Sequence, residues 1–251
     1  MKRTAIVTLA GTSSRFSRSV GRECHKSLFR EHPQDDSLLD WQLSLLERFG
    51  FANIVLVGGY KFDELVSMVN LRYADWPITV VRNDHYSDWG SCYSLCLGID
   101  AVPDDSTSVT FLEGDLLFDG EAFAELLSIE DDAITANKSI VDARTSVAFY
   151  VSRSGRLRYI YDTAHSSLKI EEPFIRIGNS GQVWQFANAK RLKACALRCG
   201  ETEWHGTNLL PIIDYYSTVD ACAIRICSFD KWFNCNTISD YRSMKAYAKG
   251  T

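Results

Sequence analysis

Strand-like runs alternate with amphipathic segments along the first half of the chain, and this alternation constrains the fold more than any single motif. Runs of β-branched and aliphatic residues, typical of buried strands, occupy residues 4–9, 53–57, 78–81 and 109–112. Apolar side chains at helical spacing occupy residues 37–49, 62–69 and 93–99. Parallel strands need long crossover connections, which helices supply. The pattern therefore predicts an α/β fold with a mainly parallel sheet.

The sequence changes character near residue 131. Strand candidates there are short, at residues 134–136, 146–151, 157–161 and 182–186. Ser154-Gly155 favours a hairpin turn, which predicts a small β-meander inserted against the first sheet. Helices are expected near residues 188–199, 207–216 and 238–248, with a further strand at 221–226. Because no low-complexity linker interrupts the chain, we expect a single domain, 1–251, with halves at 1–130 and 131–251.

Composition excludes several classes of protein. Of 251 residues, 46% are hydrophobic and 24% charged, which is typical of a globular protein. The net charge of −5, without a basic block, argues against a nucleic-acid partner. No apolar run reaches the roughly 18 residues of a membrane span. The eight cysteines show no CxxC pair and no zinc-site spacing, so we expect buried thiols in a cytoplasmic protein of undetermined oligomeric state.

The loop after the first strand has the composition of an anion site. After Leu9 its residues are small, and small residues allow backbone N–H groups to approach an anion closely. They are Ala10, Gly11, Thr12, Ser13 and Ser14. Arg15 and Lys26 add cations suited to phosphate oxygens. Neither GxGxxG nor GxxxxGK[ST] is present, and an ordinary βα turn with a solvated Arg and Lys is the alternative.

This stretch, with His25-Lys26-Ser27-Leu28 after it, resembles the nucleotidyltransferase signature Leu-Ala-Gly-x-Gly-(Ser/Thr)-Arg-(Phe/Met) followed by (Pro/His)-Lys-x-Leu. The resemblance implies a Rossmann-like α/β/α sandwich with a nucleotide-binding half at 1–130 and an acceptor-binding half at 131–251. It also implies nucleotide contacts by Leu9, Ala10, Gly11, Thr12, Ser13 and Ser14. Ser13 stands where the signature has its second glycine, a position that tolerates positive φ.

Two further segments carry candidate metal ligands. Asp115 closes the run Leu112-Glu113-Gly114-Asp115, where a carboxylate suits Mg²⁺ or caps the helix expected near residue 121. The run resembles the family pattern (Glu/Asn/Ala)-Gly-Asp, whose aspartate holds magnesium. Residues 232–241 resemble the family segment Glu-Ile-Asp-Thr-x-x-Asp-Tyr, with Asn236 in place of its aspartate. The resemblance implies Mg²⁺ on Asp115 and Asn236; alternatively, Asn236 caps the last helix with Thr237.

Other segments resemble the base and acceptor sites of that family. Val57-Gly58-Gly59-Tyr60 resembles its Val-Thr-Gly-Tyr segment, and residues 83–95 resemble the Asn-x-x-Tyr…Asn-x-x-Ser-Leu pattern of the phosphocholine branch. The resemblance implies base contacts by Gly59, Tyr60, Asn83, Ser91 and Ser94. Trp184 and Tyr161 are candidates for binding a cationic acceptor through their rings, although large aromatics in a meander also suit a core.

These resemblances together imply an Mg²⁺-dependent cytidylyltransferase that transfers CMP from CTP to a phosphocholine-like or phosphonate acceptor and releases pyrophosphate. Arg15 would hold the β- and γ-phosphates, and Lys26 would stabilise charge at the α-phosphate. One alternative is a sugar-1-phosphate nucleotidyltransferase that uses UTP, dTTP or GTP. Another is a nucleotide-binding module without catalysis, suggested by Ser13 and Asn236.

Overall fold

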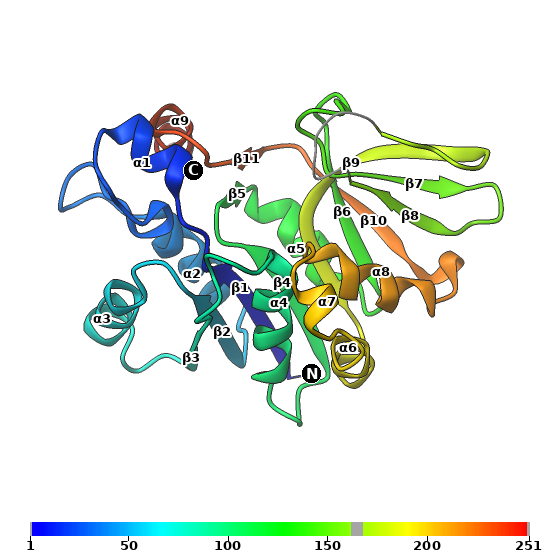
Figure 1. Cartoon of the computed structure of the whole chain (residues 1–251), viewed down its shortest axis with the longest axis horizontal. Helices are drawn as coiled ribbons and strands as arrows, with labels where there is room; N and C mark the ends of the chain where they lie inside the picture. Colours follow the sequence, from blue (N-terminus) through cyan, green and yellow to red (C-terminus); the bar gives the residue numbers. More distant parts are fainter. Residues whose placement is uncertain (1, 162–167, 250–251) are drawn as a thin grey trace.

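The computed structural model describes residues 2–161 and 168–249 of the chain. A nine-stranded sheet runs through it in the order β10-β6-β9-β4-β1-β2-β3, with β7 and β8 attached beside β9 (Figure 1). Its strands are β1 (Arg3–Leu9), β2 (Asn53–Gly58), β3 (Ile78–Arg82), β4 (Ser108–Glu113), β6 (Ala133–Asn137), β7 (Ala148–Ser152), β8 (Leu157–Ile160), β9 (Phe174–Phe186) and β10 (Arg225–Phe229). A second, two-stranded sheet pairs β5 (Leu116–Phe118) with β11 (Trp232–Asn234).

The helices of the described residues complete the α/β/α sandwich that the sequence predicts. They are α1 (Ser14–Val20), α2 (Leu38–Arg48), α3 (Phe62–Arg72), α4 (Ser91–Asp100), α5 (Gly120–Ser128), α6 (Ala189–Ala196), α7 (Glu201–Trp204), α8 (Leu209–Ser217) and α9 (Ile238–Ala248), with 3₁₀ turns η1 (Lys26–Leu28) and η2 (Ala221–Ala223). Within the described ranges, no helix combines the length and apolar character that a bilayer crossing requires.

Strand direction places the C-terminal ends of β1, β2, β3 and β4 along one edge of the sheet. Strand β1 pairs in parallel with β2 on one side and β4 on the other. Strand β9 is the antiparallel member, paired with both β4 and β6. The prediction of a mainly parallel sheet with a meander is confirmed, and the meander consists of β7, β8 and the first part of β9.

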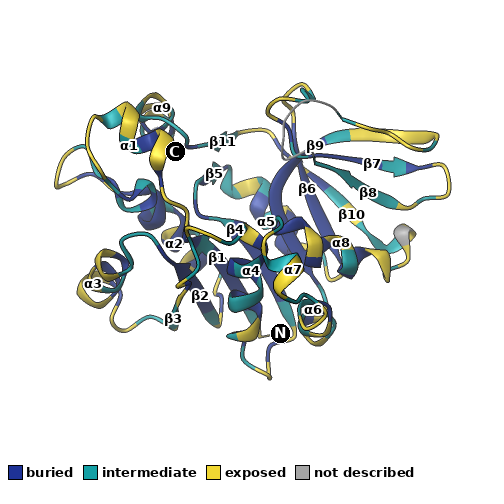
Figure 2. Ribbon diagram, viewed as in Figure 1, coloured by how far each residue is buried: buried dark blue, intermediate teal, exposed yellow. Residues whose placement is uncertain are grey.

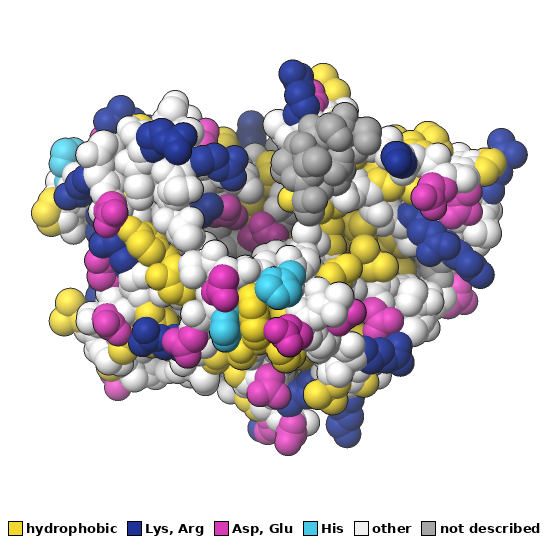
Figure 3. Space-filling model, in the orientation of Figure 1, with side chains coloured by type: hydrophobic (Ala, Val, Ile, Leu, Met, Phe, Trp, Pro, Cys, Tyr) yellow, Lys and Arg dark blue, Asp and Glu magenta, His cyan; other side chains and the backbone are white. Residues whose placement is uncertain are grey.

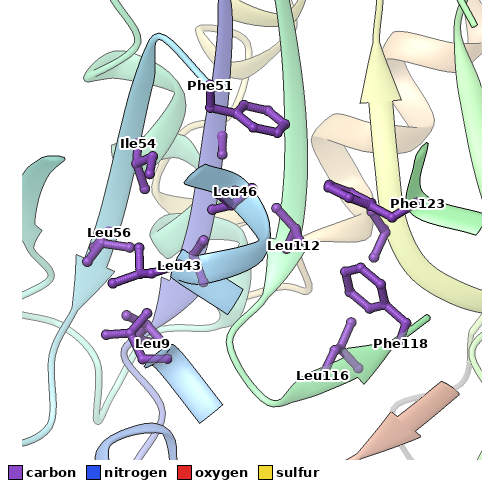
Figure 4. Close-up of a cluster of buried hydrophobic side chains, with 14 of the residues drawn as sticks. Leu9, Leu43, Leu46, Phe51, Ile54, Leu56, Leu112, Leu116, Phe118 and Phe123 are labelled. Carbon is purple, nitrogen blue, oxygen red and sulfur yellow. The ribbon is translucent and has the colours of Figure 1, made fainter. Parts of the chain in front are cut away.

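Two hydrophobic layers hold the helices against the sheet. On one face, α2, α3 and α5 bury apolar side chains against β1, β2 and β4, including Leu43, Leu112 and Phe123 (Figure 4). On the other face, α4, α6 and α8 pack around Phe111 and Trp184. Because the central strands are covered on both sides, they are buried along most of their length (Figure 2), which explains their nearly continuous apolar sequence.

A third, smaller cluster joins the two ends of the chain. Phe16 of α1 and Tyr241 of α9 pack around Phe29, so α1 and α9 lie together in Figure 1. The N-cap of helix α9 is Thr237, whose hydroxyl accepts a hydrogen bond from the backbone N–H of Asp240, while the Asp240 carboxylate accepts one from the Thr237 backbone. This capping box fixes the start of α9 and the direction of the residues just before it.

Two strand predictions in the second half are wrong. Residues 221–226 do not form one strand: Asp220 accepts hydrogen bonds from the backbone N–H groups of Cys222 and Ala223, which forms the turn η2, and β10 begins only at Arg225. Strand β9 is 13 residues long instead of the five predicted at 182–186. Its first residues include Ile175 and Ile177, but Gly178-Asn179-Ser180-Gly181 follows them, and this composition is typical of a turn, so the sequence did not predict one continuous strand.

Candidate functional site

A cavity of about 500 Å³ opens at the edge of the sheet where β1 and β4 end. Figure 3 shows this face hollowed between two lobes, with acidic side chains at the bottom of the hollow and Lys and Arg side chains on its rim. Leu9, Gly11, Ser13, Arg15 and Lys26 line it from the β1 side, and Asp115 lines it from the end of β4. The volume is in the usual range for a small-molecule site.

In the loop after β1, Ser13 has the left-handed backbone conformation that glycine adopts most easily. This residue has a φ of 55°, in the left-handed region, at the position of the second glycine in the nucleotidyltransferase signature. That conformation costs a residue with a Cβ about 1–2 kcal/mol. The Ser13 hydroxyl offsets part of the cost by accepting a hydrogen bond from the Lys26 backbone N–H at 3.1 Å. Gly11 leaves open space where a Cβ would project, so a ligand can approach its backbone.

Arg15 is an exposed cation at this loop. It makes no ion pair or hydrogen bond with any residue in the described part of the chain, and it lines both the main cavity and an adjoining cavity of about 200 Å³. Thr12 and Ser14 line only the adjoining cavity. A guanidinium without a protein partner, beside small loop residues, is available to bind an anion.

Lys26 and Asp115 meet at the centre of the cavity. The Lys26 Nζ donates to Asp115 Oδ2 at 2.6 Å and to the backbone oxygen of Cys235 at 3.3 Å. Both side chains retain about one fifth of their exposure, at 20% and 17%. The Cys235 backbone N–H donates to the Asp115 backbone oxygen at 2.8 Å, beside the pairing of β5 with β11. Residues from three distant parts of the chain are therefore fixed around one ammonium–carboxylate pair.

Asp115 and Asn236 both line this cavity. Asp115 Oδ1 is buried and has no hydrogen-bond partner among the described residues. Asn236 donates its Nδ2 to Asn234 Oδ1 at 2.7 Å, so the amide oxygen is its remaining ligand atom. Carboxylate and amide oxygens suit Mg²⁺, and an orphaned carboxylate oxygen is the donor such an ion satisfies. The donor set therefore fits the magnesium that the sequence predicts.

Neither capping alternative explains these two residues. The cap of α5 is Asp119, whose Oδ1 accepts from the Ala122 backbone N–H at 2.7 Å. The cap of α9 is Thr237, and Asn236 contributes only its backbone N–H, to Asp240. The side chains of Asp115 and Asn236 therefore remain directed to the cavity.

Of the predicted base contacts, Ser91 lines the main cavity, whereas Asn83 and Ser94 do not. The Ser91 hydroxyl accepts from the Asn208 backbone N–H at 2.9 Å. Asn83 is only 1% exposed and donates its amide to Ser94 Oγ at 2.9 Å, so these two groups satisfy each other beneath the surface.

Gly59 and Tyr60 contact the loop of residues 10–15 after β1, which is called the phosphate loop below because its sequence predicts an anion site. The Tyr60 backbone N–H donates to the backbone oxygen of Ala10 at 3.2 Å. A Cβ at Gly59 would lie 2.4 Å from the Cβ of Tyr86, so only glycine fits this close approach. Among the described residues, Gly59, Tyr60, Ala10, Asn83 and Ser94 are not on the walls of either cavity. Their role toward a base stays a prediction.

The wall opposite the phosphate loop contains the predicted acceptor residues. Tyr161 is half-buried and lines the cavity. Trp184 also borders it, but this side chain is fully buried, and its indole N–H donates to the Tyr159 hydroxyl. Arg144 lines the same wall and is 81% exposed, paired with Asp142. The sequence did not single out Arg144, because it lies in an irregular segment without a motif.

Comparison with known proteins places the chain in a family. The sequence profile of DUF6564, a domain of unknown function, matches residues 22–248. The chain belongs to the DUF6564 family. No curated protein matches the sequence of this DUF6564 chain.

Solved structures show the fold that the DUF6564 chain shares. The inositol-1-phosphate CTP transferase from T. maritima aligns over 99% of this chain and 96% of its own, with a TM-score of 0.71 and 16% identity. A candidate glucose-1-phosphate thymidylyltransferase from Bacillus anthracis aligns over 99% and 96%, with a TM-score of 0.69 and 14% identity. The CTP:phosphocholine cytidylyltransferase from Streptococcus pneumoniae aligns over 99% and 100%, with a TM-score of 0.62 and 12% identity. The DUF6564 chain therefore has the nucleotidyltransferase fold.

Glu113 is a site residue of the DUF6564 chain that sequence reasoning missed. Burial and repulsion from Asp115 raise the pKa of its carboxyl to about 7, while a hydrogen bond from the Asn208 amide at 2.6 Å favours the ionised form. Both residues line the cavity. The sequence signal for Glu113 was its place at the end of a buried strand, two residues before the candidate ligand Asp115. Its partner Asn208 lies 95 positions away in the chain, and no local pattern reveals a contact over that separation.

Buried polar side chains hold the turn that carries Asp115. Gln42 of α2 donates its amide to the backbone oxygens of Glu113 and Leu116, each at 2.9 Å. Ser27 donates its hydroxyl to the Gly114 oxygen at 2.8 Å. A Cβ at Gly114 would come within 2.7 Å of a backbone oxygen of β1. The turn after β4 is therefore held by Gln42, by Ser27 and by its close contact with β1. The sequence signal for this arrangement was Gln42, a polar residue within the apolar stripe of α2.

Proposed function

We propose that this chain is an Mg²⁺-dependent nucleotidyltransferase that transfers CMP from CTP to a small phosphorylated or phosphonate acceptor and releases pyrophosphate. An oxygen of the acceptor anion attacks the α-phosphorus, and the bond from that phosphorus to the bridging oxygen of the β-phosphate breaks. The electron pair of this bond leaves with pyrophosphate. The attacking oxygen is already ionised, so the reaction needs no side-chain nucleophile and no general base.

One observation carries the proposal. Lys26, Asp115 and Asn236 come from three separate segments and meet beside a small-residue loop at the C-terminal edge of a parallel sheet. Ligands of open α/β sheets bind at this edge. A cation, a carboxylate with a free oxygen and an amide are the groups that positioning and charge neutralisation require.

Each of the remaining polar groups has a place in this scheme. The exposed backbone of Gly11 and the guanidinium of Arg15 suit the β- and γ-phosphates, because both face open space at the loop. Lys26 suits the charge that develops at the α-phosphate, because Asp115 and Cys235 hold its ammonium at the cavity. The fixed position of Lys26 means that little reorganisation is needed when charge develops.

Asp115 and Asn236 are the residues that would hold Mg²⁺. The ion supplies charge neutralisation for the triphosphate and a Lewis acid at the phosphoryl oxygens. Asn236 contributes no negative charge, so we expect weaker metal affinity than two carboxylates would give. The nearby Glu113 carboxylate adds negative charge to the same cavity when it is ionised.

An anionic acceptor suits the opposite wall. Arg144 brings an exposed guanidinium to the cavity, and the rings of Tyr161 and Trp184 border it. A phosphate or phosphonate would contact the cation, and its organic group would contact the ring of Tyr161, since Trp184 is fully buried. The preference for CTP is supported by the resemblance of residues 83–95 to the phosphocholine branch. Two of the structurally similar enzymes are also named for CTP.

The test measures pyrophosphate release by the full chain with Mg²⁺, each of CTP, UTP, dTTP and GTP, and a panel of acceptors. The panel contains phosphocholine, aminoalkyl and hydroxyalkyl phosphonates, inositol 1-phosphate and hexose 1-phosphates. We expect turnover with CTP to exceed turnover with UTP by more than about 10²-fold in kcat/KM, the scale of unmade buried hydrogen bonds. Lys193→Ala, which alters an exposed ion pair with Asp104, is the control for nonspecific effects.

Two other outcomes have defined meanings. Equal or better use of UTP, dTTP or GTP with a hexose 1-phosphate would replace the cytidylyltransferase proposal with the sugar-phosphate alternative. Saturable CTP binding in calorimetry, without pyrophosphate release for any acceptor, would support a nucleotide-binding module. Loss of CTP binding in the Arg15→Ala chain would then still locate the nucleotide at the loop.

A further inference from the structure

Three cysteine thiols converge outside the cavity. Cys92 and Cys96 lie four residues apart on one face of α4, and Cys199 comes from the connection between α6 and α7. Their sulfur atoms all lie within 4.8 Å of one another, and the Sγ atoms of Cys92 and Cys96 are 4.0 Å apart. The spacing along the sequence predicted no such group. The tertiary fold assembles it from positions more than 100 residues apart.

The backbone around the thiols is held in place before any ligand binds. The Gly90 N–H donates to the Trp204 oxygen at 2.9 Å, and the Cys92 N–H donates to the Gly206 oxygen at 3.2 Å. These bonds tie the start of α4 to the end of α7. A Cβ at Gly90 would lie 1.9 Å from the Gly206 oxygen, so the two segments approach as closely as glycine permits. The sulfur atoms therefore belong to a rigid frame.

A second observation points to a ligand at the same place. The indole Nε1 of Trp204 is buried and makes no hydrogen bond to a described residue. The Trp204 ring packs against Tyr93 of α4, with ring centroids 5.2 Å apart, so this N–H lies beside the helix that carries Cys92 and Cys96. Buried N–H groups without partners are costly, and N–H donors directed at thiolates are usual around metal–sulfur sites.

We propose that Cys92, Cys96 and Cys199 bind a thiophilic divalent cation such as Zn²⁺. Three thiols lose their protons to solvent, and three sulfur–metal bonds form. Tetrahedral Zn–S bonds of about 2.3 Å place sulfur atoms about 3.8 Å apart. The Cys92–Cys96 pair is already close to this separation, and the most distant pair needs to approach by at most about 1 Å. A solvent water completes the fourth position, because Cys96 and Cys199 are only half-buried.

Another group of potential ligands in the described residues is already neutralised. Glu31, His32 and Asp35 also lie close together, but Lys245 pairs with both carboxylates and Arg242 pairs with Glu31. A cation there would have to displace these ion pairs. The three thiols have no comparable cationic partner among the described residues, so they are the better metal site.

The bound ion would fix one wall of the main cavity. Ser91 immediately precedes Cys92 and lines that cavity, and its hydroxyl accepts from the Asn208 backbone. Asn208 in turn holds Glu113. An ion on the three thiols joins α4 to the segment that leads to Asn208, so it stabilises these contacts without touching a substrate.

The test uses the full chain, reduced with a non-chelating phosphine and freed of metal. Zn²⁺ binding is measured by equilibrium dialysis with elemental analysis, and Co²⁺ is used as a spectroscopic probe. We expect one Zn²⁺ per chain, a higher Tm on Zn²⁺ addition, and a sulfur-to-cobalt charge-transfer band. That band distinguishes thiolate ligation from any ion held by Asp115, so the result is independent of the proposed function.

Variants locate the ion. Cys199→Ser and Cys96→Ser change half-buried thiols. Each should weaken Zn²⁺ binding by at least about tenfold and weaken the charge-transfer band, because one of three sulfur–metal bonds is lost. Cys222→Ser removes an exposed thiol and should bind as the unaltered chain does. Circular dichroism shows whether each variant is folded. If the Cys199→Ser chain does not fold, the Cys96→Ser chain provides the test.

Three results would overturn the proposal. The first is that the folded, reduced chain binds no Zn²⁺. The second is that the Cys199→Ser and Cys96→Ser chains bind Zn²⁺ as tightly as the unaltered chain. The third is that the charge-transfer band keeps its full intensity in both variants. A disulfide between Cys96 and Cys199 in a chain that binds no Zn²⁺ when reduced would assign the cluster to thiol oxidation instead.

Discussion

The two walls of the cavity are built in different ways. On the phosphate-loop side, Lys26 contacts Asp115 and Cys235, which lie 89 and 209 positions away in the sequence. On the opposite wall, Arg144 is 81% exposed and pairs with Asp142, two positions away. Long-range contacts fix Lys26 within the fold. The opposite wall also contains the buried Trp184, but Arg144 is held only by its own loop. Binding residues held only by their own loop can change without loss of the fold.

Under the proposed function, we expect the chemistry at the fixed wall and acceptor selection at the exposed wall. Groups that act on a transition state must be positioned before it forms, and the long-range contacts provide this. Groups that select an acceptor need only contact it. Substitutions on the first wall should therefore lower kcat, while those on the second should raise the KM for the acceptor.

The largest effect is expected for Asp115→Ala. Loss of this carboxylate removes the charged metal ligand and the partner of Lys26, so Mg²⁺-dependent turnover should fall by at least about 10³-fold. Asn236→Asp should retain activity and tighten Mg²⁺ binding, because it adds a charge. Initial rates against Mg²⁺ concentration check both. An unchanged Mg²⁺ response in the Asp115→Ala chain would mean that the metal site lies elsewhere.

Lys26→Ala should lower kcat by at least about 10²-fold, because a cation directed at transition-state charge contributes several kcal/mol. The KM for CTP should change less, since Arg15 and the loop backbone remain. Steady-state kinetics beside the Lys193→Ala control measure this. A folded Lys26→Ala chain with kcat within threefold of the unaltered one would remove Lys26 from the mechanism.

His25 gives the fixed wall a dependence on pH. Burial lowers the pKa of its imidazole to about 4, although its Nε2 bonds the Leu9 oxygen at 2.9 Å. The unfolded chain binds this proton near pH 6.5 and the folded chain does not. Stability should therefore be complete above pH 6.5 and fall as the pH drops toward 4, by up to about 1.4 kcal/mol per pH unit.

Urea unfolding of the unaltered and His25→Gln chains between pH 4 and 7.5 tests this slope. Glutamine keeps a donor for the Leu9 oxygen but does not titrate, so the difference in stability between the two chains should shrink as the pH falls. A difference that stays constant with pH would show that His25 does not resist protonation.

Arg144→Ala tests the exposed wall. It should raise the KM for the acceptor by about tenfold, the contribution of one charge-assisted hydrogen bond. The KM for CTP and the stability should remain unchanged, because Arg144 contacts only its own loop. Arg153→Ala, at an exposed position away from the cavity walls, is the matched control. An equal loss of kcat and of CTP affinity would contradict the division between the two walls.

The smallest effect concerns Ser13. The Ser13→Ala and Ser13→Gly chains both lose the hydroxyl that accepts from Lys26, and they differ only in the cost of a Cβ at positive φ. The glycine chain should therefore be the more stable by about 1 kcal/mol. Chemical denaturation measures the difference. Equal stabilities would mean that the turn is relaxed in solution.

Apart from the short elements α1 and β5, the sequence alone determined the order of strands and helices in the first half of the chain. Buried strands and amphipathic helices leave local patterns of apolar residues. The sequence also indicated the phosphate loop, Lys26 and Asp115, since these lie in short motifs beside strand ends. The structure confirmed the fold and placed these residues together. By contrast, the first part of the long antiparallel β9 was missed, because Gly178-Asn179-Ser180-Gly181 within it has the composition of a turn.

Only the tertiary structure decided which distant side chains meet. The Glu113–Asn208 bond, the brace by Gln42 and the thiol cluster of Cys92, Cys96 and Cys199 each join residues that lie far apart in the chain. It also decided that Asn83 bonds Ser94 inside the protein instead of lining the cavity. Hydrogen bonds and thiol groupings depend on distances of a few ångströms, and such distances follow from packing of whole elements, which no local sequence pattern encodes.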